Sequence, residues 1–138
     1  MCQSMKRVDH VGIVVDDLVQ AKEFVTKVLG FVPDREFSLP EQSVLAAFFT
    51  IGDTRVELIE VTDPSLRAQR LGEGAKARIE HVAIEVEDLD ATIKVLREKG
   101  VRTSTPEPWV VGSNRNLFTD PDTCDGVKYQ FFDRRAHT

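Results

Sequence analysis

Four side chains of this sequence have the types and spacing of metal ligands. His10 lies in the run VDHVGIVVDDL at residues 8–18, and His81 lies in the run IEHVAIEVEDL at residues 79–89. The two runs keep the histidine, the apolar alternation and the acidic residues in step, which indicates an internal duplication. Each copy closes on a strand with an oxygen ligand, Glu57 in the first and Gln130 in the second. Imidazole nitrogens and side-chain oxygens suit a divalent ion such as cobalt, nickel, manganese, iron or zinc.

Each copy also contains the elements that would position its pair of side chains. Residues 8–15 and 79–86 alternate as strands, and His10 belongs to the face opposite the bulkiest apolar residues of its strand. The helix-like residues 21–29 and 91–99 follow, and each stretch ends at a glycine that suits a left-handed helix stop. The remaining expected strands are 44–51, 54–61, 109–111, one that begins at Asn116, and 127–133.

The apolar residues of each helix predict its buried face. In the first helix they recur at Ala21, Phe24, Val25, Val28 and Leu29, and we expect this helix to cover the face of the first strand that carries Val11, Ile13 and Val15. In the second helix they are Leu89, Ile93 and Leu96. An aspartate precedes each helix and can cap it.

Composition and charge narrow the class of function. The chain has 18 basic and 23 acidic residues, a net charge of −5, and the two signs are interspersed. A nucleic-acid partner is therefore not expected, because phosphates require a basic surface. No apolar run approaches the roughly 18 residues of a membrane span, so no membrane association is expected either. Cys2 and Cys124 lie far apart without CxxC spacing, which favours a reducing compartment and a cytoplasmic protein.

The duplicated module resembles the vicinal oxygen chelate superfamily, which includes glyoxalase I, bleomycin resistance proteins and extradiol dioxygenases. The resemblance covers residues 6–133 and is greatest to methylmalonyl-CoA epimerase-like proteins. The stretches that carry it are VDHVGI at 8–13, KVLGF at 27–31, LPEQ at 39–42, GDTRVELIE at 52–60 and CDGV at 124–127.

This resemblance implies an α+β fold in which two tandem βαβββ modules form curled mixed sheets around a central cleft. We expect one glyoxalase-like domain over residues 1–138. Its first module would be 6–61, its linker 62–77 and its second module 78–133.

The resemblance also implies a divalent metal held by His10, Glu57, His81 and Gln130, with Glu57 as the catalytic base. Glyoxalases and epimerases usually have a glutamate where this chain has Gln130. An amide oxygen can coordinate a metal but cannot accept a proton at neutral pH, and it lowers the ligand charge from −2 to −1. Ala46 stands where some epimerases place a catalytic glutamate. A single base favours isomerisation or one-sided proton transfer over racemisation.

The same residues have structural interpretations. A histidine on a strand can be a satisfied core residue, and Glu57 can form an ion pair with Arg55 or Lys128. Gln130 can be a buried amide that is bonded to the main chain.

Three further residues are candidates for substrate binding. Asn114 and Arg115 can hold a phosphate or carboxylate, given the paired donors of arginine, or they can shape a turn. Trp109 can stack on a substrate or supply buried area at a rim or interface.

The sequence therefore predicts a metal-dependent isomerase, epimerase or lyase that works through an enolate, with an acyl-CoA thioester as its small-molecule substrate. By resemblance we also expect a homodimer. Three alternatives stay open. They are a lactoylglutathione lyase-like enzyme, a non-catalytic small-molecule binder of the antibiotic-resistance type, and an extradiol-type dioxygenase with His10, His81 and Glu57 on iron.

Overall fold

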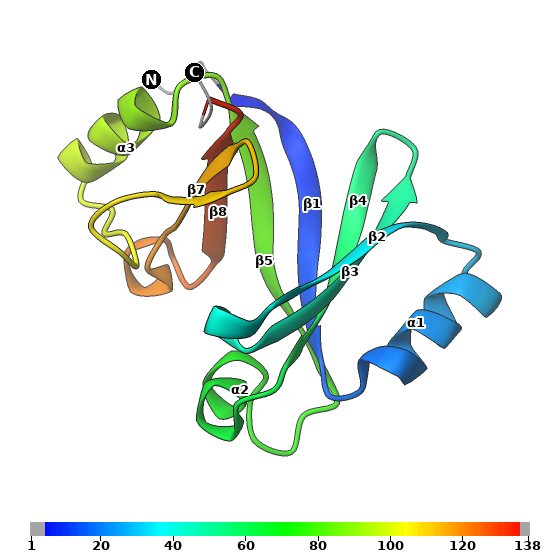
Figure 1. The fold of residues 1–138 in the computed structure, drawn as a ribbon. Coiled ribbons are helices and arrows are strands. Elements are labelled where there is room, and N and C mark those ends of the chain that lie inside the picture. The colour runs from blue at the N-terminus through cyan, green and yellow to red at the C-terminus, as the bar shows by residue number, and fades with distance from the viewer. Residues whose placement is uncertain (1–4, 136–138) are drawn as a thin grey trace. The chain divides into compact units, whose positions relative to one another are not determined.

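The structure is a computed structural model, which describes residues 5–135 (Figure 1). Cys2 lies outside these residues, and Cys124 is not part of a disulfide. The strands are β1 (Met5–Val15), β2 (Val32–Leu39), β3 (Val44–Ile51), β4 (Thr54–Val61), β5 (Ala77–Val86), β6 (Trp109–Val111), β7 (Asn114–Phe118) and β8 (Lys128–Asp133). The helices are α1 (Leu18–Lys27), α2 (Pro64–Arg70) and α3 (Leu89–Glu98), with 3-10 turns η1 (Pro40–Gln42) and η2 (Pro121–Thr123).

The chain divides into two compact units. Residues 10–80 form the N-terminal unit, and residues 81–135 together with 5–9 are the described part of the C-terminal unit. Each unit contains a strand, a helix and three further strands in the same chain order. The expected α+β class with repeated βαβββ order is therefore confirmed.

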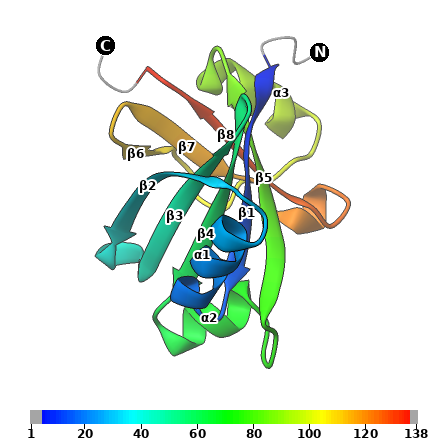
Figure 2. The same ribbon diagram turned by 90° about the vertical axis from the view of Figure 1, so that its right-hand side faces the viewer.

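The N-terminal unit has the strand order β2-β3-β4-β1, with β1 parallel to β4 and the other neighbours antiparallel. Helix α1 lies over β3 and β4 (Figure 2), where Val25 packs with Val15 and Leu58 in one apolar cluster. Val14 points to the other face and packs with Ala46 in a second cluster. The expected alternation of β1, with His10 and Val14 on the face opposite Val15, is thus observed.

Helix α1 is capped as expected but buries fewer of its apolar residues. Asp17 accepts a hydrogen bond from the main-chain nitrogen of Gln20 at 3.0 Å, and Gly30 follows the helix with φ of +76°. Three of the five apolar residues at helical spacing are exposed, since Phe24, Val28 and Leu29 have 53%, 67% and 51% of their surface accessible. Val28 and Leu29 follow the last helical residue, and Phe24 lies on the flank of the helix, so they miss its buried stripe.

The C-terminal unit repeats this arrangement with the order β5-β8-β7-β6 and a parallel β5–β8 pair. Asp88 caps α3 through the main-chain nitrogen of Ala91 at 3.2 Å. Leu89 and Ile93 are buried with Phe131, and Leu96 packs against the same cluster. The predicted buried face of this helix is therefore confirmed.

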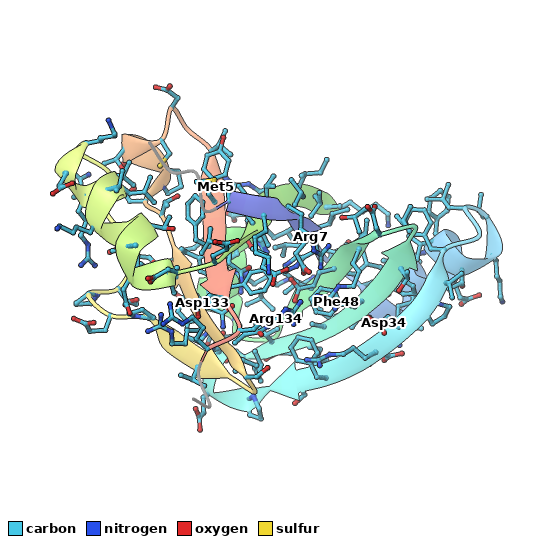
Figure 3. All side chains as sticks on the ribbon, turned by 90° about the horizontal axis from the view of Figure 1, so that it is seen from above. Met5, Arg7, Asp34, Phe48, Asp133 and Arg134 are labelled. Carbon is cyan, nitrogen blue, oxygen red and sulfur yellow. The ribbon has the colours of Figure 1, made fainter. Side chains whose placement is uncertain are left out.

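Two arginines tie the first residues of β1 to the C-terminal unit. Arg7 donates to Asp9 at 2.7 Å and to Glu85 at 3.2 Å, and Arg134 donates to Glu85 at 3.0 Å. Arg7 and Arg134 are labelled in Figure 3. Asp9 is 1% and Glu85 6% exposed, so each of these buried carboxylates has a cationic partner, as buried charges require. These contacts explain why residues 5–9 group with the second repeat.

Element boundaries differ from the expectations in a few places. Strand β2 was not predicted, because residues 32–39 are mostly polar and exposed and lack alternation. Strand β7 begins at Asn114 rather than Asn116, and β1 begins at Met5 rather than Val8. Among the described residues, none of the helices has the length and apolar character needed to cross a membrane.

Candidate functional site

His10 and Glu57 lie side by side in the N-terminal unit. Parallel pairing of β1 and β4 places Gly12 opposite Glu57, and His10 Nε2 is 3.3 Å from Glu57 Oε1. His10 is 5% and Glu57 9% exposed. Two ligands that each lie about 2.1 Å from one ion, at right angles, are about 3 Å apart. The spacing and the chemistry of this buried pair therefore fit shared coordination of a metal ion.

Phe48 on β3 holds the His10 ring in place. It pairs with Glu57 in the β3–β4 register, and its ring meets the imidazole edge-on with centroids 5.0 Å apart. The guanidinium of Arg55 lies over the same ring at 4.0 Å and contacts Asp34 at 3.3 Å. Phe48 and Asp34 are labelled in Figure 3, on the neighbouring strands β3 and β2. The aromatic ring and the cation restrict the orientation of His10.

Arg70 adds a fixed positive charge to this unit. It donates two hydrogen bonds to Glu80, at 2.8 and 2.7 Å. Burial lowers the pKa of Arg70, but the hydrogen bond and charge of Glu80, with a further contribution from the charge of Glu57, raise that pKa above its ordinary value. Glu57 therefore lies within electrostatic reach of a cation.

His81 has corresponding neighbours in the C-terminal unit. It is 2% exposed, and its ring meets Phe118 edge-on with centroids 5.2 Å apart. The amine of Lys128 lies over the Phe118 ring at 4.3 Å. Trp109 packs on the same phenyl ring, with centroids 5.2 Å apart and an interplanar angle of 32°. This contact favours the interpretation of Trp109 as buried area, and its role in substrate binding stays a prediction.

Gln130 lies on β8 opposite Phe118 of β7 and Ala83 of β5. Its Nε2 donates to Asn116 Oδ1 at 2.9 Å. Asn116 is 5% exposed and donates from Nδ2 to the main-chain oxygens of Trp109 and Asn114, at 3.5 and 3.4 Å. Gln130 is thus bonded to a side chain through its nitrogen, whereas the sequence interpretation considered a bond to the main chain.

Arg115 is engaged by carboxylates. It donates to both oxygens of Asp133, at 3.1 and 2.9 Å, and to Asp90 at 3.1 Å. Asp133 also accepts from the main-chain nitrogen of Leu89 at 2.8 Å. Desolvation raises the pKa of Asp133, but the hydrogen bonds from Arg115 and Leu89 outweigh it and hold that pKa below its ordinary value. These contacts favour a structural role for Arg115, whose substrate-binding role stays a prediction.

Asn114 has a different environment from Arg115. Its Oδ1 is buried and, within residues 5–135, has no hydrogen-bond partner. A buried acceptor without a partner costs about 1–3 kcal/mol, which a ligand or a water molecule could recover. Asn114 therefore stays the stronger candidate of the two for contact with a substrate.

Sequence reasoning did not identify three residues that support the candidate ligands. They are Phe48, Phe118 and Asn116, each on the strand that neighbours a closing strand. The duplication contained the signal for the two phenylalanines, since each pairs with a predicted ligand. Asn116 could have been found only from the register of β7, two residues before Phe118.

The sequence also matches known proteins along most of its length. Residues 7–131 match the family model described as the Glyoxalase/Bleomycin resistance protein/Dioxygenase superfamily. The mitochondrial methylmalonyl-CoA epimerase of Bos taurus is 30% identical over 126 residues, which cover 90% of this chain and 72% of that protein.

Solved structures resemble the chain over nearly all of it. The methylmalonyl-CoA epimerase of Mycobacterium tuberculosis superposes with a TM-score of 0.86 at 27% identity, covering 96% of this chain and 91% of that chain. A variant of the Streptomyces coelicolor methylmalonyl-CoA epimerase, in complex with 2-nitronate-propionyl-CoA, superposes with a TM-score of 0.84 at 30% identity. The latter match covers 94% of this chain and 98% of that chain.

Proposed function

Since the chain belongs to the Glyoxalase/Bleomycin resistance protein/Dioxygenase superfamily, we propose that it is a metal-dependent isomerase that acts through an enolate on an acyl-CoA thioester. The observation that carries this proposal is the buried pair of His10 and Glu57, 3.3 Å apart. Methylmalonyl-CoA epimerases among the relatives support the substrate class. The Streptomyces coelicolor complex adds chemical support, because a 2-nitronate of propionyl-CoA resembles the enolate of that thioester.

The metal ligands in this proposal are His10, Glu57, His81 and Gln130. In this proposal His10 and Glu57 of the N-terminal unit would share the ion with His81 of the C-terminal unit, and the amide oxygen of Gln130 would be the fourth ligand. Two imidazoles, one carboxylate and one amide suit cobalt, nickel, manganese, iron or zinc. A divalent ion there would supply Lewis-acid stabilisation of the enolate oxygen.

Glu57 is the base in this proposal. Its carboxylate would take the proton from carbon 2, and the electron pair of the C–H bond would move toward the thioester carbonyl to form the enolate. The protonated Glu57 would then return a proton to the same face of carbon 2. Because Glu57 is only 9% exposed, water would compete little for this proton.

The family resemblance would place a second base, on the opposite face of the substrate, at position 130 or position 46. Neither residue of this chain can act as one. Gln130 cannot accept a proton at neutral pH. Ala46, at 1% exposed in an apolar cluster with Val14, cannot do so either. We therefore propose that the enzyme exchanges the proton of carbon 2 faster than it inverts that carbon.

Solvent exchange tests this proposal. Protein loaded with cobalt or manganese is incubated with propionyl-CoA or methylmalonyl-CoA in deuterium oxide, and mass spectrometry follows deuterium at carbon 2. The wild type should exchange, and Glu57→Gln should lower the exchange rate by about 10²–10⁴, the usual contribution of a general base. Glu23→Gln, which changes a carboxylate that is paired with Lys27 at the surface, should exchange like the wild type.

Three outcomes would contradict the proposal. Exchange that persists in Glu57→Gln would remove Glu57 as the base. Equal rates of exchange and inversion in the wild type would require a second base. Oxygen uptake with a catechol by the iron-loaded protein, without exchange into thioesters, would favour the dioxygenase alternative.

A further inference from the structure

Gln130 can serve as a metal ligand only if its oxygen, and not its nitrogen, is presented to the ion. The amide nitrogen carries two hydrogens and has no lone pair to donate, so a Gln130 turned by 180° would place donors against a cation. A carboxylate has no such requirement, since its two oxygens are equivalent. The replacement of a glutamate by a glutamine therefore creates a need for something that fixes the amide.

We infer that Asn116 is the positioning residue that sets the amide orientation of Gln130, and this inference rests on the proposed function. Asn116 Nδ2 donates to the main-chain oxygens of Trp109 and Asn114. Because main-chain oxygens only accept, these contacts fix the Asn116 nitrogen on their side and leave Oδ1 toward Gln130. Gln130 must then present its nitrogen to Asn116, as it does at 2.9 Å, and Oε1 becomes the atom available for coordination.

The sheet makes this orientation rigid. Asn116 is 5% exposed on β7, between β6 and β8, and pairs with Trp109 on one side and Phe132 on the other. Gln130 pairs with Phe118, two residues further along β7. A reversed Gln130 would put Oε1 against Asn116 Oδ1, two acceptors in contact, and the buried Asn116 could relieve this only by giving up its two main-chain bonds.

The N-terminal unit provides an internal control for the inference. Glu57 pairs with Phe48 of β3, as Gln130 pairs with Phe118 of β7. The residue two positions before Phe48 is Ala46, which has no polar side-chain atom. Within one chain, the carboxylate is therefore matched with an alanine and the amide with an asparagine, as expected if only the amide needs to be oriented.

The test is a double-mutant cycle between positions 116 and 130, read out as the affinity for Co²⁺ or Mn²⁺ by calorimetry. Asn116→Leu keeps the side-chain volume but removes the acceptor, and it should weaken binding by about 10–100-fold in the wild-type background, as loss of an outer-shell partner does. In the Gln130→Glu background the same substitution should leave affinity unchanged or raise it, because it removes an acceptor that opposes the carboxylate. Equal losses in both backgrounds, or no loss in the first, would overturn the inference.

A second readout works without metal. In the nitrogen NMR spectrum of the metal-free protein, the side-chain NH₂ signal of Gln130, assigned by its absence in Gln130→Glu, should move toward the position of a solvated amide in Asn116→Leu. An unmoved signal would overturn the inference even if metal binds. Conversely, a wild type that binds no metal but shows this shift would refute the proposed function and leave the orientation of Gln130 supported.

Asn116→Asp keeps the experiment informative if Asn116→Leu does not fold. A carboxylate at this position still accepts from Gln130 Nε2 but no longer donates to Trp109 and Asn114. The Gln130 signal should then remain that of a bonded amide, and the metal affinity should be at least that of the wild type. A solvated Gln130 signal in this variant would contradict the inference.

Discussion

The N-terminal unit with His10 (the first half) and the C-terminal unit with His81 (the second half) surround their candidate ligands with the same kinds of side chain. We call this shared arrangement the frame. Each histidine ring meets a phenylalanine edge-on, Phe48 in one half and Phe118 in the other, at 5.0 and 5.2 Å. A cation lies over each phenyl ring, at 4.0 Å in the first half and 4.3 Å in the second. The frame is duplicated, but the closing strand offers a carboxylate in one half and an amide in the other.

The difference extends to the residues behind the ligands. Glu60, three residues after Glu57, accepts from the first main-chain nitrogen of α1 at 2.8 Å. Asp133, three residues after Gln130, likewise accepts from the first main-chain nitrogen of α3. It also accepts two hydrogen bonds from Arg115. Under the proposed function, the first half would supply the base, and the second half would supply a neutral ligand on a strand that has an additional ion pair behind it.

Exchanging the two ligands is the strongest test of this division. In the double variant Glu57→Gln with Gln130→Glu, the carboxylate and the amide trade halves while the total ligand charge stays constant. We expect deuterium exchange at carbon 2 to fall by about 10²–10⁴, because the base no longer lies in the half with Arg70. Mass spectrometry of the thioester measures the rate, and calorimetry checks that metal affinity is retained.

A double variant that exchanges at the wild-type rate would show that the halves are interchangeable. A variant that loses metal entirely would instead show that ligand placement, and not only ligand charge, controls binding. The single variant Gln130→Glu serves as the matched control, and it should keep exchange because Glu57 is unchanged.

The bracing of the two helices should differ by a measurable amount of stability. Asp133→Asn removes one charge of a partly buried ion pair whose arginine keeps Asp90 as a second partner, so we expect a loss of about 1–3 kcal/mol. Glu60→Gln keeps an acceptor for the Leu18 main-chain nitrogen and should cost about 1 kcal/mol or less. Urea unfolding measures both free energies, and an equal loss in the two variants would contradict the proposed difference in bracing.

Much of the fold could be predicted because the repeat is strong where side chains are buried. Residues 44–51 and 54–61 were predicted with the observed bounds, since buried strands retain apolar runs. Strand β2 was missed because it is mostly exposed and polar, so no pattern marks it. Phe24 of α1 shows the opposite error, because its helical spacing predicts a buried side chain and the structure exposes it.

The candidate site was predictable as types of ligand but not as their surroundings. Spacing within the repeat singled out His10 and Glu57, and the structure places them 3.3 Å apart. The contacts of Arg115 with Asp133 and Asp90 could not be inferred, because they depend on how β7, β8 and α3 pack. Asn116 was missed for the same reason, since its importance comes from the register of two strands.

The smallest expected effect concerns the cations above the two phenyl rings. Arg55→Met should lose about 0.5–1 kcal/mol of cation–π stabilisation, and Lys128→Met a similar amount. Arg55 also contacts Asp34 at 3.3 Å, and an exposed pair of this kind adds at most about 1 kcal/mol, so its substitution should cost slightly more. Double-mutant cycles with Phe48→Leu and Phe118→Leu, followed by urea unfolding, isolate the ring contribution in each half. A coupling energy between cation and ring in one half and none in the other would contradict this expectation. It would mean that the two halves share this geometry but do not both gain stability from it.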